Sequence, residues 1–286
     1  MKYGIPASEG AGFFVFGGEL PDLDAIPPDL TRKGGGEVLH FPSLDGRGSG
    51  EGVSVLYVMA NRLILIRHGD LGESRRGRYI GRTDAALSAE GRRQAAALSE
   101  PLARIGGALF FASPLLRTRE TAEIALGAGR CCEVDDNLRE IDFGRWDGMS
   151  FAEIVAADPA AVNRWAALEE EFAFPDGEGI AHFRGRIRAA ADRAVAAPAG
   201  TVVLFAHGGV IRFLVCRLLG LPDRHHLLFE IGQASISEIR VDGGRGVLTR
   251  LNDRCHLEAL AQPGNRIPEA CIGSGAQFSK VSRKER

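Results

Sequence analysis

The sequence predicts an α/β protein, a three-layer α/β/α sandwich whose central sheet is mostly parallel. Short continuous apolar runs, such as Leu63–Ile66 and Val202–Phe205, are typical of strands that a parallel sheet buries on both faces. Segments with helical spacing of apolar residues follow these runs, so strands and helices alternate along the chain. With 286 residues, 45% of them hydrophobic and 25% charged, the chain can bury a sizeable core.

A predicted helix follows the first strong strand, Leu63–Ile66. Ser88 can cap this helix, which runs toward Ile105 with its large apolar side chains at helical spacing. Pro101 lies within the helix, and a proline there removes a backbone donor and clashes with the preceding turn. We therefore expect the helix to be kinked or split.

A second short strand, Leu109–Ala112, leads directly into another helix. Ser113 is suited to the cap of that helix, and Pro114 to its first helical position. The helix should extend to about Leu126. Arg117, in the first turn of this helix, would lie at the carboxyl edge of the sheet.

The second half of the regular region continues the alternation. Ser150 and Glu153 have the spacing of a capping box and indicate a helix start. Ile180–Ala197 has one apolar face and predicts an amphipathic helix. Val202–Phe205 is a third buried strand, and Gly209–Leu219 a helix that follows it.

The regular region ends in a predicted β-hairpin. Its strands are Ser235–Val241 and Val247–Leu251, joined through Gly243 and Gly244. Glycines at this point can supply the positive φ angles that tight hairpin turns need. The hairpin is the only antiparallel feature that the sequence indicates.

Three parts of the chain differ in composition and in the periodicity of their apolar residues. Residues 59–257 carry the regular pattern and are predicted to form the folded domain. Residues 1–58 include Lys33–Gly52, which is rich in glycine and shows no lasting period, so it buries too little apolar surface to offset its ordering entropy. They are either a natural extension or a non-native addition, with Met59 as the true start. Residues 258–286 predict a mobile, solvated tail.

Composition excludes several classes of protein. A net charge of −2 argues against a general nucleic-acid binder. The most apolar stretch, Thr201–Leu221, contains histidine and arginine residues that a lipid core would disfavour, and Phe13–Phe16 is too short for a secretory signal. Five scattered cysteines, without metal-ligand spacing, indicate reduced thiols. These features favour a cytoplasmic protein.

Two histidines share one local pattern, a buried strand followed by His and Gly. They are His68 and His207, and both should emerge at the carboxyl edge of the sheet, where α/β proteins bind ligands. Arg67 adjoins the first, and Arg117 lies early in a helix after another strand. A guanidinium group binds phosphate through paired N–H donors and stays charged at neutral pH. The set therefore predicts a phosphate site.

These residues stand within motifs that resemble the histidine phosphatase superfamily, which includes cofactor-dependent phosphoglycerate mutases and alpha-ribazole phosphatases. The resemblance extends from Leu63 to about Asp253. Five blocks carry it in order: Leu65–Gly69, Tyr79–Ala95, Ser113–Ala122, Leu138–Gly148 and Ala206–Gly209. An Arg-His-Gly triplet alone is a weak signal, but five blocks in this order are highly specific. The resemblance implies a phosphoglycerate mutase-like fold.

The resemblance also implies catalytic roles. His68 would be the nucleophile and would become a phosphohistidine. Arg67, Arg117 and His207 would clasp the phosphoryl oxygens. Glu140 would donate a proton to the leaving oxygen and later assist a water molecule. Acid catalysis of this kind typically contributes about 10²–10⁴-fold.

The loop that follows the Arg-His-Gly triplet departs from the pattern of the family. Ser74 stands where many relatives place a phosphate-contacting asparagine, and Asp70 and Leu71 replace the residues that usually follow the Arg-His-Gly triplet. Gly81 and Gly208 are further candidates for phosphate contact, because glycine lets the backbone approach a ligand. No metal or other cofactor is implied.

The expected partner is a small-molecule phosphate ester, with neither nucleic acid nor membrane, and the sequence makes no prediction of oligomeric state. Mutases of the family carry a long insertion between the residues that match Glu140 and His207, so the modest segment here favours hydrolysis. Pro175–Gly179 resembles a stretch of alpha-ribazole phosphatases. The expected substrate is therefore alpha-ribazole 5′-phosphate, in cobalamin biosynthesis. The alternatives are a broad-specificity sugar-phosphate phosphatase, a phosphoglycerate mutase, and a non-catalytic protein that binds phosphorylated ligands.

Overall fold

The computed structural model describes residues 37–41, 53–57, 60–242, 244–261 and 278–279. A seven-stranded sheet lies at the centre, in the order β8-β7-β3-β6-β4-β5-β9. Its strands are β3 (Arg62–Arg67), β4 (Ala108–Ala112), β5 (Cys132–Val134), β6 (Thr201–Ala206), β7 (Ile236–Asp242), β8 (Arg245–Asp253) and β9 (Phe278–Ser279). The three strands that the apolar runs indicate all form.

The sheet is mostly parallel, as predicted. β3 pairs with β6, β6 with β4, β4 with β5 and β5 with β9, all in parallel. β7 runs antiparallel to both β3 and β8, and β7 and β8 form the expected hairpin. Arg67 is opposite Ala206 in the β3–β6 register. The residues that follow these two positions, His68 and His207, therefore leave the sheet side by side.

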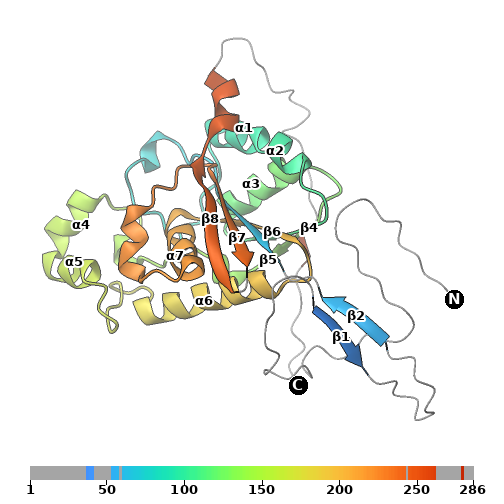
Figure 1. Ribbon diagram of the computed structural model, residues 1–286. Coiled ribbons are helices and arrows are strands. Elements are labelled where there is room, and N and C mark those ends of the chain that lie inside the picture. The colour runs from blue at the N-terminus through green and yellow to red at the C-terminus, as the bar shows by residue number, and fades with distance from the viewer. Residues whose placement is uncertain (1–36, 42–52, 58–59, 243, 262–277, 280–286) are drawn as a thin grey trace.

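Helices cover both faces of this sheet (Figure 1), which confirms the three-layer α/β sandwich. α1, α2 and α3 lie on one face, and α6 and α7 on the other, while α4 and α5 lie beyond the sheet. The α-helices are α1 (Ala89–Ala97), α2 (Ser99–Ala103), α3 (Leu116–Leu126), α4 (Phe151–Ala157), α5 (Pro159–Ala166), α6 (Ile180–Ala196) and α7 (Gly208–Leu219). Short 3₁₀ turns are η2 (Glu73–Arg75), η3 (Asp136–Leu138), η4 (Gly144–Trp146), η5 (Asp223–Leu228) and η6 (Cys255–Ala261).

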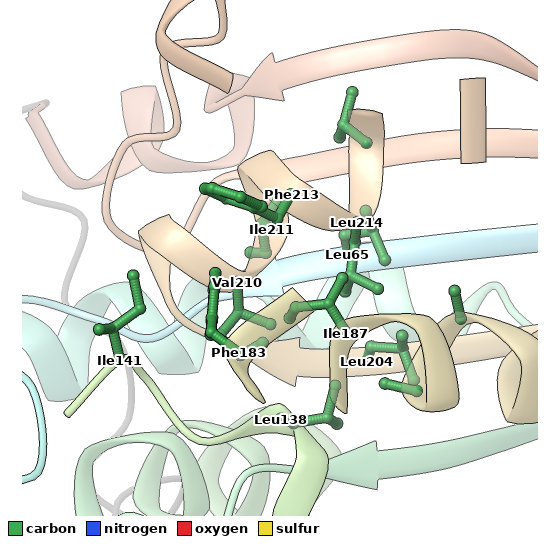
Figure 2. Packing of buried hydrophobic residues seen from close by; sticks show 14 of the residues in the cluster. Leu65, Leu138, Ile141, Phe183, Ile187, Leu204, Val210, Ile211, Phe213 and Leu214 are labelled. Carbon is green, nitrogen blue, oxygen red and sulfur yellow. The ribbon is translucent and has the colours of Figure 1, made fainter. Parts of the chain in front are cut away.

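The continuous apolar runs are explained by two cores, one on each face of the sheet. Successive side chains of a strand point to opposite faces. Ile64 and Ile66 of β3 join the core that includes α1–α3, whereas Leu65 joins the core with α6 and α7. Figure 2 shows Leu65 gathered with Ile187 of α6 and Leu214 of α7. A strand segment buried on both faces needs apolar residues throughout, and Leu63–Ile66 of β3 has them.

Two helix predictions need correction in detail. The helix capped by Ser88 does split, but at Leu98, so that α1 and α2 meet three residues before Pro101. Ser113 does not cap α3, because the helix begins at Leu116 with Leu115 in the cap position. Ser113 has a different partner, His207. The capping box at the start of α4 forms as predicted.

Some regular structure lies where none was expected. Glu37–Phe41, within the glycine-rich segment, forms β1 and pairs antiparallel with β2 (Val53–Tyr57) in a separate sheet. β9, in the expected tail, pairs with β5. Pairing with a partner can select a short strand that the local pattern does not indicate. The predicted division into a folded domain and two end segments stays a prediction.

The rest of residues 1–58 and of the tail, together with Met59, Gly243 and Cys271, lies outside the described residues. The other four cysteines are free thiols. In the described part of the chain, the structure contains no helix long and apolar enough to cross a membrane.

Candidate active site

His68 follows β3 and is almost fully buried, with 4% of its surface exposed. Its Nδ1 lies 2.8 Å from the carbonyl oxygen of Gly69. A carbonyl oxygen can only accept a hydrogen bond, so Nδ1 carries the proton and Nε2 keeps its lone pair. The backbone N–H of His68 donates to Ala206 of the neighbouring strand. The ring is thereby fixed with one nitrogen available for bonding.

The surroundings of His68 keep the imidazole neutral. Burial lowers the pKa of His68 well below its ordinary value of 6.5, and the positive charges of Arg117 and Arg67 lower it further, while the hydrogen bond to Gly69 opposes them. A neutral imidazole is a nucleophile, whereas an imidazolium is not. The structure therefore gives His68 the neutral form that a nucleophile requires.

His207 follows β6, and both of its ring nitrogens have partners. Nδ1 accepts a hydrogen bond from Nε of Arg117 at 3.2 Å. Since Nδ1 accepts, Nε2 carries the proton, and it lies 2.8 Å from Oγ of Ser113 and 3.3 Å from Oγ1 of Thr118. The rings of His68 and His207 have centroids 5.3 Å apart. The two histidines thus form one site with differently engaged rings.

Arg117 is fully buried and fixed by backbone carbonyls. Its Nη groups donate to the carbonyl oxygens of Thr83 at 2.9 Å, Gly81 at 2.8 Å and Ile80 at 3.3 Å. Burial lowers the pKa of Arg117 to about 10, so the side chain is still charged at neutral pH. It forms no ion pair with a carboxylate in the described part of the chain. The site holds a positive charge that an anion can neutralise.

Arg67 lies beside the start of α7. Its Nη1 donates to the carbonyl oxygen of Ile231 at 2.7 Å. A Cβ on Gly208 would lie 3.4 Å from both Cζ and Nε of Arg67, so the glycine brings the helix start close to the guanidinium group. Nε of Arg67 is buried and has no hydrogen-bond partner among the described residues. A buried donor without a partner at a helix N-terminus is suited to an anion.

Glu140 completes the polar set. Its Oε2 accepts from the backbone N–H of Gly209, and its Oε1 from that of Ile141, both at 3.0 Å. A Cβ on Gly209 would approach Oε1 to 2.5 Å, so only glycine fits there without displacing the carboxyl group. Glu140 is therefore held against the first turn of α7, on the His207 side of the site.

A buried ion pair supports the segment that carries Glu140. Arg186 of α6 bonds Glu178 through Nε and Nη2, both at 2.7 Å, and each residue is at most 8% exposed. The same guanidinium donates to the carbonyl oxygens of Asn137 at 2.9 Å, of Glu140 at 3.2 Å, and of Arg139. Arg186 thus fixes the backbone of residues 137–140, the stretch that ends at Glu140.

The weaker site candidates have other surroundings. Ser74 is exposed in η2. Gly81 binds Arg117 through its carbonyl, its N–H donates to Asp147, and a Cβ there would lie 2.3 Å from a backbone oxygen of Ile141. Gly81 therefore positions Arg117, and its N–H is already occupied. The structure brings together His68, His207, Arg67, Arg117, Glu140 and Gly208, and no hydrogen bond among the described residues joins Ser74 to this group.

Sequence reasoning missed the residues that support the site. Ser113 was assigned to a helix cap, Thr118 and Glu178 received no role, and Arg186 was assigned only to an amphipathic helix. A signal existed for Ser113, since it follows a buried strand directly and so lies at the same edge as the histidines. For Arg186 the signal was weak, because an arginine on a helix is usually solvated.

Comparison with known proteins places these residues in a wider group. The sequence profile described as "Histidine phosphatase superfamily (branch 1)" matches residues 63–254. Phosphoserine phosphatase 1 of Hydrogenobacter thermophilus is 33% identical over 68% of this chain and 94% of its own length. Glucosyl-3-phosphoglycerate phosphatase of Mycolicibacterium vanbaalenii is 34% identical over 72% of this chain and 98% of its own.

Solved structures with the same fold extend the comparison. A putative alpha-ribazole-5′-P phosphatase from Escherichia coli superposes with a TM-score of 0.62 at 28% identity. The match covers 68% of this chain and 97% of the bacterial one. The sequence profile, the relatives and the solved structure match the same region of this chain, and they agree on one family.

Proposed function

Since the chain belongs to the histidine phosphatase superfamily and is a phosphoric monoester hydrolase, we propose that it acts through a phosphohistidine on His68. The observation that carries the proposal is the hydrogen bond of Nδ1 to Gly69, which leaves Nε2 with its lone pair. Phosphate-monoester hydrolysis is among the slowest uncatalysed reactions, and a covalent intermediate divides it into two easier displacements.

In the first displacement, Nε2 of His68 forms a bond to phosphorus as the ester P–O bond breaks. The leaving oxygen takes a proton from Glu140, because an alkoxide leaves poorly unless it is protonated. A bound phosphate dianion would favour proton uptake by a neighbouring carboxylate. The placement of Glu140 against Gly209, beside the pocket of both histidines, supports this role.

Arg67, Arg117 and His207 are proposed to bind the phosphoryl oxygens. Each charged hydrogen bond contributes about 1.5–3 kcal/mol, so two arginines have a decisive effect on affinity for a dianion. Nε2–H of His207 is directed at Ser113 and Thr118. To donate to a phosphoryl oxygen, the ring of His207 has to shift. The charges are fixed in place before the substrate arrives, which favours a transition state that is stabilised by charge and position.

In the second displacement, water attacks the phosphohistidine and Glu140 takes its proton, which restores both residues. Inorganic phosphate then leaves. A mutase would instead return the phosphoryl group to a second hydroxyl of a bound ester. The relatives are named as phosphatases, which supports water as the acceptor.

For the substrate we propose a small phosphomonoester. The predicted alpha-ribazole 5′-phosphate is supported by likeness to two solved alpha-ribazole phosphatases, at 28% and 27% identity. The names of the relatives at 33% and 34% identity instead favour phosphoserine or a phosphoglycerate derivative as the class of ester. All three are esters of one phosphate with a small organic alcohol.

The experiment that tests the mechanism is phosphate release from a panel of esters, with the variant His68→Ala beside the wild type. The panel contains alpha-ribazole 5′-phosphate, phosphoserine, phosphoglycerates, sugar phosphates and p-nitrophenyl phosphate. Turnover by the wild type, and mass spectrometry of alkaline-quenched enzyme that locates a phosphoryl group on His68, are the expected results. Failure to hydrolyse any ester, or full activity of His68→Ala, would overturn the proposal.

The variant Glu140→Gln separates proton donation from nucleophilic attack. It should slow esters of poorly leaving alcohols by about 10²–10⁴-fold. Hydrolysis of p-nitrophenyl phosphate should change much less in this variant, since nitrophenolate leaves without a proton. Equal slowing of both kinds of ester would remove Glu140 from the role of acid.

A further inference from the structure

One short segment, residues 229–232, holds two arginine side chains at the edge of the phosphoryl pocket. Nε of Arg212 donates to the carbonyl oxygen of Phe229 at 2.8 Å. Nη1 of Arg67 donates to the carbonyl oxygen of Ile231 at 2.7 Å. Because the two acceptors are two residues apart, the guanidinium groups of Arg67 and Arg212 are anchored at neighbouring points of the same segment.

A third arginine covers the end of this segment. A Cβ built on Gly232 would lie 2.9 Å from Cδ of Arg254 and 3.3 Å from its Nε. Asn252 also fixes Gly232, since its Oδ1 accepts from the backbone N–H of Gly232 at 2.6 Å. The side chain of Arg254 therefore lies against the residue next to the anchor of Arg67.

The geometry of α7 brings Arg212 to the same side as Arg67. Residues four apart on a helix share a face, and Gly208 and Arg212 are such a pair. The Gly208 position faces Cζ and Nε of Arg67 at 3.4 Å. Arg212 is thus the next side chain along the face of α7 that meets the phosphoryl pocket.

These positive charges have no carboxylate partner. In the part of the chain that the structure describes, none of the ion pairs includes Arg67, Arg212 or Arg254. Burial lowers the pKa of Arg67 most, and the charge of Glu140 raises it. The positive charges of Arg212 and Arg254 lower the pKa further, so the three guanidinium groups are electrostatically close. Like charges at short range are unfavourable unless an anion lies between them. Arg67, Arg117 and His207 already suffice for one phosphoryl group.

We propose that Arg212 and Arg254 form a second anion subsite beside the phosphoryl pocket, and that the enzyme prefers phosphate esters that also carry a carboxylate. This inference rests on the proposed function of the same site. Nε of Arg212 is occupied by Phe229, so its two Nη groups remain, and paired N–H donors match the two oxygens of a carboxylate. Alpha-ribazole 5′-phosphate has no carboxylate and is then a poorer substrate.

The test uses two esters that differ by the carboxylate alone, O-phosphoserine and O-phosphoethanolamine. The wild type should show a kcat/KM for phosphoserine about ten- to a hundredfold higher, the range of a charged hydrogen bond. Arg212→Gln and Arg254→Gln should each lower this ratio severalfold or more, and Arg212→Lys should retain part of it. Arg217→Gln is the matched control, since Arg217 lies on the same helix and pairs with Asp192 at the surface.

Several results would overturn the inference. Equal kcat/KM values for the two esters in the wild type would do so without any variant, whether or not the variants fold. Arg212→Gln and Arg254→Gln variants that lower both values by the same factor would assign these arginines to the phosphoryl group alone. Failure of the proposed function is distinct, because then p-nitrophenyl phosphate is not hydrolysed either.

Discussion

His68 and His207 occupy matching places in the fold but have different partners. Each follows a buried parallel strand, precedes a glycine and is almost completely buried. His68 uses one ring nitrogen on a backbone carbonyl and leaves the other unengaged. Both nitrogens of His207 are engaged, by Arg117 on one side and by Ser113 and Thr118 on the other.

In the proposed mechanism, this difference separates a nucleophile from a binding group. A ring with an unengaged Nε2 lone pair can form a bond to phosphorus, whereas a ring with its proton on Nε2 can only donate. The backbone provides the first arrangement and two hydroxyl side chains provide the second. The arrangement of His68 depends on the next residue in the chain, whereas that of His207 depends on distant residues, since Ser113 and His207 are 94 positions apart.

The largest expected effect comes from the ring with the unengaged nitrogen. His68→Ala should lower kcat for any phosphomonoester by a factor of about 10⁶, the size seen when a catalytic nucleophile is removed. Steady-state phosphate release measures it. A contradicting result would be that His207→Ala lowers kcat as much while His68→Ala still forms the phosphoenzyme. His207, and not His68, would then be the nucleophile.

A smaller effect is expected at the ring with two partners. His207→Asn keeps a donor but loses the imidazole geometry, and removal of one group that stabilises a transition-state charge costs about 10²–10³-fold in kcat. The phosphohistidine should still be detected in this variant by mass spectrometry after alkaline quenching. Its complete absence would show that His207 is needed for attack itself.

The two rings should behave alike toward acid. Burial lowers the pKa of His207, as of His68, well below 6.5, so the folded protein keeps both neutral while the unfolded chain takes up protons. Stability is present above pH 6.5 and is lost below it, by about 1.4 kcal/mol per pH unit for each histidine. Urea unfolding at pH 7.5 and 5.5 measures this.

Matched variants isolate each contribution to this acid sensitivity. His68→Gln and His207→Gln should each lose about 1.4 kcal/mol less than the wild type between those two pH values. A variant whose loss equals that of the wild type would show that its histidine is already protonated in the folded state. That result would contradict the neutral, nucleophilic ring proposed for His68.

The smallest effect is expected at the support of His207. Ser113→Ala removes the hydroxyl 2.8 Å from Nε2, and one hydrogen bond of about 0.5–1.5 kcal/mol corresponds to a two- to tenfold lower kcat. Ser235→Ala is the matched control, because Ser235 is equally buried and its Oγ has no partner among the described residues. If both variants retain full activity, Ser113 does not orient the ring.

Much of the fold followed from local pattern. The runs of β3 and β6 had to be strands buried on both faces, since no amphipathic helix or exposed strand is apolar at every position. The carboxyl edge of the sheet then followed as the place of His68 and His207. The start of α3 did not follow, because the attraction of Ser113 to a helix cap was outweighed by its contact with a histidine in another strand.

Local pattern was enough to place His68, His207 and Arg117 at the carboxyl edge of the sheet, because strand ends and the residues after them are encoded locally. It also determined the family, through five motifs in one order. Only the tertiary structure decided which histidine keeps an unengaged nitrogen, how Arg186 fixes the turn that carries Glu140, and how residues 229–232 gather Arg67, Arg212 and Arg254. These depend on contacts between distant segments, and no local period or propensity records such contacts.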